Sequence, residues 1–341
     1  MIEKLEIALI QNIIRLLMRG SDESALWQAK KLQDFGLLES MNRELVIDLL
    51  PEIMDDAMRE IDRAIKAGAS RVDVYAKSLA EQLPIDSSPK LKAVYAGWYR
   101  VTGQQLNRMA GSMLNSAKRI YTDTVEKVAA LNLSGAIPLR QAIRDTCYQW
   151  AADGIKGFRD KADREWSAEA YAQTLLRSTT ANARREAGFA RMEELELDLI
   201  IVSSHLDARP GCEPYQGRIF SLYGKTEGFD TLDDTTYGDP DGLFGINCRH
   251  TYAPYTEGMA AVKYDKDDVE LAYKESQEQR RLERAIRKEK KELAAAQALG
   301  DKARIKHFSD RVKAGQVKMR EFIEESGRTR RYDREQTYGG K

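Results

Sequence analysis

Apolar residues follow a helical spacing along most of this chain, and that spacing stops over one segment, residues 203–255. Apolar side chains three or four positions apart line one face of a helix, so the pattern predicts a mainly α-helical chain. The interrupted segment is instead rich in Gly, Pro, Asp and Tyr, and it holds two of the three Cys and two of the three His residues. We therefore expect a small non-helical part carried between helical regions.

Three helix boundaries can be predicted from capping residues. Ser88 followed by Pro89 predicts a helix start, because a serine oxygen caps the first turn and proline suits the first helical position. Ser167 caps a later helix in the same way. Gly68 predicts the end of an earlier helix, because glycine is common just beyond the last helical turn. The apolar stripe of that earlier helix is formed by Ile53, Ala57, Ile61 and Ile65.

Short strands are expected where the helical spacing stops. Residues 197–202 are apolar and β-branched, which predicts a buried strand, and residues 217–222 could form a second one. After Gly258 the chain becomes charged and helical again. Gly300-Asp301 separates two helices, and so short a connection predicts an antiparallel helical hairpin.

The predicted fold class is therefore mainly α, with a helical N-terminal region, a small α+β Cys/His-containing domain and a C-terminal antiparallel helical hairpin. The predicted regions are 1–86 and 87–165, both helical, then 166–258 as the α+β domain and 259–341 as the hairpin with a basic tail. The tail would touch nucleic acid or an acidic partner surface, or remain solvated. Its arginines are Arg328, Arg330, Arg331 and Arg334.

Composition excludes several classes of protein. Lys+Arg and Asp+Glu both number 54, so the chain lacks the basic excess of a protein that coats nucleic acid. Three cysteines do not make a secreted disulfide framework, which predicts folding in a reducing cytoplasm. The apolar stretch 7–18 is too short to span a bilayer and has the spacing of an amphipathic helix, so no membrane partner is expected. Cys147 shares an apolar helix face and is predicted to be a core residue.

Cysteine and histidine are concentrated in the non-helical segment, and both are zinc ligands. His205, Cys212, Cys248 and His250 would form a Cys2His2 set, with Asp207 as a further ligand or as a partner that orients an imidazole. A metal cross-link stabilises most where a segment has little core of its own. The spacing is not that of a zinc finger, because Cys248 and His250 are separated by one residue and His205 and Cys212 by six.

Other interpretations of these residues stay open. Cys212 and Cys248 could be buried small residues, with histidines that satisfy main-chain groups. A thiol beside an imidazole could also act as a nucleophile, but nothing around either cysteine indicates that arrangement. The sequence contains no Walker loop, dinucleotide-binding fingerprint or HExxH motif.

Three blocks of sequence carry a resemblance to a known family. They are Trp166–Asn182, Val202–Arg218 (VSSHLDARPGCEPYQGR) and Gly245–Tyr255 (GINCRHTYAPY). They resemble the phage minor capsid protein 2 family, which is related to the phage Mu F-type minor head proteins. The resemblance extends over about residues 90–340, is most specific in the Cys/His blocks, and is absent from residues 1–85.

The resemblance implies a structural role and no enzymatic activity. Such proteins are made beside the portal protein, enter the procapsid in few copies and lie inside the head near the portal vertex, where they are linked to DNA packaging or delivery. The implied partners are the portal protein and the major capsid protein, with packaged double-stranded DNA as a further candidate. The implied location is the interior of the virion capsid, after assembly in the host cytoplasm.

The resemblance also bears on the zinc prediction. Relatives carry Cys or His at the position of Cys212 and Asn-Cys-Arg-His where residues 247–250 stand, as metal ligands would permit. Some relatives have a further cysteine where this chain has Arg209, so the fourth ligand here is left open among His205, Asp207 and water. Arg209 would instead form an ion pair with Asp207 or another acid. The expected cofactor is a structural zinc ion.

Two alternative functions come from other classes of protein. One is a metal-dependent nuclease or toxin effector that is delivered with the genome. The other is a scaffold-like assembly factor, for which helices would suffice and a compact Cys/His block is unnecessary.

Overall fold

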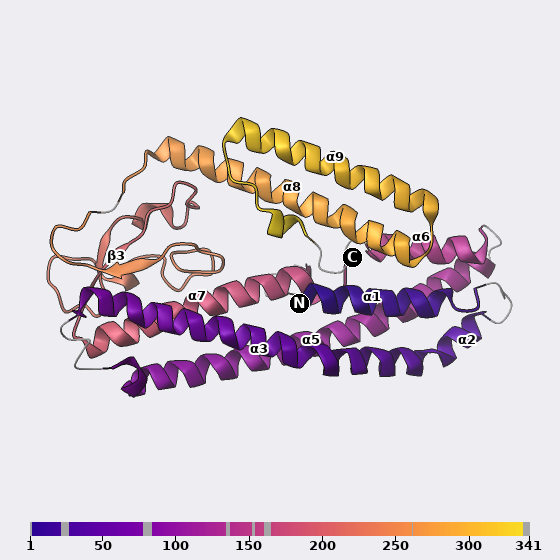
Figure 1. Ribbon diagram of the computed structural model, residues 1–341, viewed down its shortest axis with the longest axis horizontal. Coiled ribbons are helices and arrows are strands. Elements are labelled where there is room, and N and C mark those ends of the chain that lie inside the picture. Colours follow the sequence, from indigo (N-terminus) through magenta and orange to yellow (C-terminus); the bar gives the residue numbers. More distant parts are fainter. Residues whose placement is uncertain are drawn as a thin grey trace. The chain divides into compact units, whose positions relative to one another are not determined.

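The computed structural model describes residues 2–21, 27–77, 84–133, 137–151, 154–159, 165–260 and 262–336 of the 341-residue chain. Helices form most of it, so the predicted mainly α fold class is confirmed (Figure 1). The chain divides into two compact units, each assembled from separate stretches of sequence. Unit 1 consists of residues 1–53, 106–172 and 278–341, and unit 2 consists of residues 54–105 and 173–277.

Both units are built mainly from helices. The helices that lie within unit 1 are α1 (Ile2–Met18), α2 (Trp27–Gln33), α6 (Leu139–Ala151) and α9 (Lys302–Ser326). The helices that contribute residues to both units are α3 (Phe35–Tyr75), α5 (Pro89–Leu133), α7 (Ala168–Glu194) and α8 (Lys266–Ala298). Over the described residues, none of the helices combines the length and apolar character needed to cross a membrane.

The core of unit 1 is lined by the apolar face of α1 and also contains a buried ion pair. Leu5, Leu9 and Ile13 are fully buried, as the amphipathic spacing predicted. On the same helix Glu6 is buried, and its carboxylate lies 3.5 Å from Lys291 Nζ of α8 and accepts the Ile155 main-chain N–H at 2.7 Å. A buried carboxylate needs such partners, because an unpaired charge is strongly destabilising away from water.

The predicted C-terminal hairpin is present. Helix α9 folds back along α8, and the two helices pack through Leu282, Ile286 and Met319 (Figure 1). Asp301 caps α9 by accepting the Arg304 N–H at 3.2 Å. Gly327 ends the helix in the left-handed conformation, with φ of 65°.

The prediction that residues up to about 165 are almost entirely helical missed one pair of strands. β1 (Lys156–Arg159) pairs antiparallel with β2 (Glu165–Ser167). Strands of three and four residues are too short to show an alternating pattern of their own.

Unit 2 contains a three-stranded antiparallel sheet in the order β4-β3-β5. The strands are β3 (Leu199–Val202), β4 (Ile219–Ser221) and β5 (Tyr252–Pro254), so both predicted strands are confirmed. Ile200 of the central strand lies opposite Phe220 and Pro254. Apolar side chains of this sheet share a core with Val72 of α3 and Met192 of α7.

Both helix starts that were predicted from capping residues are confirmed, but the helix end predicted at Gly68 is wrong. Ser88 accepts the Leu91 N–H at 3.0 Å and Ser167 accepts the Ala170 N–H at 3.2 Å, which confirms both caps. Helix α3 instead continues past Gly68 to Tyr75. A Cβ atom at Gly68 would lie 2.1 Å from the Arg184 carbonyl oxygen of α7, so glycine here permits two helices to pack closely.

Candidate metal centre

Two loops of unit 2 carry the cysteines and the histidine that lie together. Cys212 directly precedes the short 3-10 helix η2 (Glu213–Tyr215), and Cys248 and His250 lie in the loop that leads into β5. The loop before Cys248 is closed by the Cys248 N–H, which donates to the Gly245 carbonyl at 3.0 Å. A Cβ atom at Gly245 would lie 2.3 Å from the Asp239 carbonyl oxygen, so this close crossing of the main chain requires glycine.

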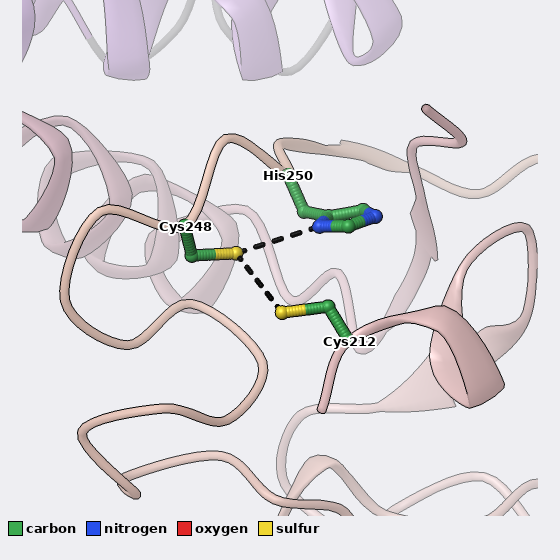
Figure 2. A group of neighbouring side chains, drawn as sticks. All are labelled: Cys212, Cys248 and His250. Atoms are coloured by element: carbon green, nitrogen blue, oxygen red, sulfur yellow. Dashed lines mark hydrogen bonds between the residues drawn. The ribbon is translucent and has the colours of Figure 1, made fainter. Parts of the chain in front are cut away.

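The three side chains point toward one another, with Cys248 Sγ between the other two (Figure 2). Cys248 Sγ lies 3.6 Å from Cys212 Sγ and 3.4 Å from His250 Nδ1. One donor atom from each residue lies within 4.8 Å of the other two. Cys212 and His250 are buried and Cys248 is half-buried, so the donors are largely shielded from water.

Neighbouring groups orient this cluster. His250 Nε2 lies 3.3 Å from Gln216 Oε1, so a proton on Nε2 would leave the lone pair of Nδ1 directed at Cys248. The Phe244 main-chain N–H donates to Cys248 Sγ at 3.3 Å. Partners of this kind fix the orientation of metal ligands in proteins. Gln216 was not predicted as a site residue, although it lies within the Pro-Tyr-Gln-Gly-Arg stretch that carried the family resemblance.

Hydrogen bonding within the cluster gives the two thiols different acidities. The hydrogen bond with Cys212 lowers the pKa of Cys248, and the contact with His250 lowers it further. The same hydrogen bond, together with burial, raises the pKa of Cys212. A thiolate is the form of cysteine that binds metal, and these donors are of the kind that zinc prefers. The residues present therefore fit a zinc ion.

The other two predicted ligands lie next to this cluster. The His205 ring packs edge-on against the His250 ring at a centroid distance of 4.9 Å, and its Nε2 lies 3.2 Å from Ser203 Oγ. Burial lowers the pKa of His205, which favours the neutral imidazole that can bind metal. Asp207 forms an ion pair with Arg249 at 2.5 Å. Of the predicted ligands, the structure therefore brings together Cys212, Cys248 and His250.

Arg209, which the family resemblance had singled out, contacts the cluster through its guanidinium. Its Nε donates to Cys212 Sγ at 3.2 Å, and its terminal nitrogens donate to the carbonyls of Ile246 and Gly242. The guanidinium therefore links Cys212 to the main chain of the loop that precedes Cys248.

The C-terminal arginines, predicted to contact nucleic acid or a partner, are partly engaged within unit 1. Arg330 makes two hydrogen bonds of 2.6 Å to Glu335 and lies over the Tyr332 ring. Arg328 donates to Gln279 at 3.0 Å. Within the described part of the chain, the side chains of Arg331 and Arg334 make no hydrogen bond or ion pair, and their role stays a prediction.

Comparison with known proteins identifies the class of this helical chain with its small Cys/His cluster. The family described as phage minor capsid protein 2 matches residues 1–324. The chain therefore belongs to this family and is a structural protein of a bacteriophage particle. The match includes residues 1–85, which had shown no resemblance, and it ends before the arginine tail.

Two curated relatives agree with this placement. A structural protein of Lactococcus phage LL-H is 28% identical over an alignment of 345 positions, which covers 95% of this chain and 92% of the relative. A structural protein of Lactococcus phage mv4 is 35% identical over 111 residues, which cover 31% of this chain and 90% of the relative. No solved structure matches the chain.

Proposed function

We propose that this protein is an internal minor head protein that lies beside the portal and helps head assembly and DNA packaging or delivery. The observation that carries this proposal is the family match over residues 1–324. The proposed neighbours are the portal protein and the major capsid protein. The proposed location is the capsid interior, reached during assembly in the host cytoplasm.

The Cys/His cluster is proposed to hold a structural zinc ion. Cys212, Cys248 and His250 supply three donors, and His205 is the proposed fourth because its ring already lies against His250. Asp207 is less suited, since Arg249 holds its carboxylate. When bound, zinc would cross-link two loops whose own secondary structure is limited to three-residue strands and 3-10 turns. A fully protein-ligated site has no open position for substrate, which favours a structural role over catalysis.

Cross-linking of purified, DNA-filled particles tests the proposed neighbours. Lys92 of unit 2 and Lys313 of unit 1 are both exposed and can report on each unit separately. We expect lysine cross-links from at least one of them to the portal and to the inner surface of the major capsid protein. Cross-links confined to tail proteins or to the outer capsid surface would contradict the proposal.

A further inference from the structure

Unit 2 contains a pocket whose lining is rich in arginine. The pocket has a volume of about 590 Å³, and its walls come from α3, α7 and the segment 244–252 that carries Cys248 and His250. All of its lining residues belong to unit 2. One acidic residue, Glu60, lines it, and no lysine does. The lining arginines are Arg63, Arg71, Arg177, Arg184, Arg185 and Arg249.

The positive charge of this pocket is only partly neutralised. Arg63 forms an ion pair with Glu60 at 2.9 Å, and Arg249 forms one with Asp207. Arg71 donates to the Tyr252 carbonyl at 3.0 Å instead. A carbonyl oxygen orients a guanidinium without cancelling its charge, so the positive charge of Arg71 remains available to a ligand.

Two further arginines have unused donors. The main-chain carbonyl of Phe244 and the side chain of Asn182 accept hydrogen bonds from Arg185, but its Nε is buried and has no partner among the described residues. Over the same part of the chain, the exposed side chain of Arg184 makes neither a hydrogen bond nor an ion pair. The Arg185 guanidinium also lies over the Tyr237 and Phe244 rings, 5.6 and 5.3 Å from their centroids, which hold it in place without cancelling its charge.

The arginines are spread along the pocket and do not surround one point. Arg177 and Arg184 are seven residues apart on α7, which is about 10 Å at 1.5 Å per residue. Arg63 and Arg71 are eight residues apart on α3, which is about 12 Å. A ligand that used both ends of either row would need anionic groups distributed over a similar length.

We propose that this pocket binds a ligand that carries several phosphate groups. Guanidinium groups present a planar fork of donors that pairs with phosphate oxygens in bidentate fashion, and the lining contains arginine to the exclusion of lysine. A nucleic acid strand has one phosphate per about 3.4 Å of axis, so about three phosphates would match the length of either row. The volume lies within the usual range of ligand pockets, about 300–1,000 Å³. The arginines that carry this proposal are not themselves proposed metal ligands, and the proposal goes beyond the proposed position in the head.

The phosphate chemistry could come from a nucleic acid backbone or from a free oligophosphate, and two probes separate these sources. Binding to the purified full-length protein would be measured for inorganic tripolyphosphate by calorimetry and for a labelled 20-base-pair DNA duplex by fluorescence anisotropy. The test variant combines Arg177→Ala with Arg184→Ala, two exposed positions on α7. The control combines Lys92→Ala with Arg100→Ala, which removes two exposed positive charges from α5 of the same unit outside the pocket.

We expect the wild-type protein to bind at least one probe, and the test variant to bind it at least about tenfold more weakly than the control, because hydrogen bonds to charged groups are stronger than those between neutral groups. For the duplex, the slope of log K against log salt should also become shallower by about 0.9 for each phosphate that the variant no longer neutralises. Unchanged melting temperatures and circular dichroism would show that both variants fold. Preference for the duplex identifies a nucleic acid backbone, and preference for tripolyphosphate identifies a free oligophosphate.

Three outcomes would overturn the proposal. The first is that the wild-type protein binds neither probe. The second is that the test variant and the control bind equally well. The third is that polyglutamate of matched charge competes as effectively as the phosphate probes, which would identify the pocket as a site for an acidic polypeptide.

Discussion

At the scale of single residues, the Cys248 sulfur is the centre of the candidate metal site. It lies within 3.6 Å of both another thiol and an imidazole nitrogen, and a main-chain N–H donates to it. These contacts lower its pKa and so favour a thiolate, whose negative charge a bound cation would balance. Without a cation, a half-buried thiolate beside a second thiol is a costly arrangement.

Replacement of the ligands should therefore change zinc content and stability together. We expect Cys248→Ser to abolish zinc binding and to lower the melting temperature by at least about 5 °C, since binding energy at a structural site contributes to folding. His205→Ala should reduce zinc content as well, whereas Asp207→Ala should leave it unchanged. The measurement is elemental analysis by mass spectrometry together with thermal denaturation of each purified variant.

Cys147→Ala is the matched control, because Cys147 is fully buried in α6 of unit 1 and lies outside the cluster. It should lower stability by leaving a small cavity and should not change the zinc content of the protein. If Cys248→Ser retained both the zinc content and the melting temperature of the wild type, the ligand assignment would be wrong.

The sequence could predict which residues form this cluster but not how they are arranged. Cys212, Cys248 and His250 were identifiable because cysteine and histidine are rare in the chain and concentrate in one segment. The position of His205 beside His250, and the contact of Gln216 with both histidines, depend on how two loops cross. Glutamine is a common residue with no metal-binding signature, so nothing in the spacing distinguished it.

At the scale of helices and strands, glycine has two different roles in this chain. Gly327 ends α9 with a positive φ, as glycine at a helix end should. Gly68 lies within α3 and lets the main chain of α7 approach, since a side chain there would overlap the Arg184 carbonyl. Sequence alone does not separate these roles, because helix packing depends on a partner that is distant in the sequence. The same limit applies to β1 and β2, whose pairing stabilises strands too short to be predicted.

A pair of glycine substitutions tests the packing role. Gly68→Ala should destabilise the protein by about 1–3 kcal/mol, because the added methyl group forces α3 and α7 apart. Gly97→Ala in α5 should instead stabilise it by about 0.5–1 kcal/mol, because no atom lies within 4 Å of the added Cβ and alanine favours the helix. Urea denaturation of both variants measures the two free energies of unfolding. A stabilised Gly68→Ala variant would show that the two helices do not pack as described.

At the scale of the whole molecule, two kinds of sequence signal predicted the fold and the class of protein. Apolar spacing predicted a mainly helical chain, and capping residues located several helix starts, because both signals are local. The family resemblance rested on the Cys/His blocks and began at about residue 90, whereas the family match covers residues 1–324. The N-terminal helices escaped recognition because amphipathic stripes such as that of α1 occur in many unrelated helical proteins.

The division into two units also depends on contacts that no local signal records. Each unit is built from stretches that are far apart in the sequence, and α3, α5, α7 and α8 contribute to both. Local sequence patterns can predict only continuous regions, such as residues 1–86 or 166–258. Long-range packing of helices decides which of those stretches share a core.

The position of the protein in the phage head is tested most directly by quantitative mass spectrometry of purified, DNA-filled particles, with the copy number counted relative to the portal protein. An internal minor head protein should be present intact, in numbers comparable with the portal subunits and far below those of the major capsid protein. Presence in empty precursors but absence from filled particles would contradict this position and identify an assembly factor. Absence from both kinds of particle would also contradict it and would favour a metal-dependent enzyme.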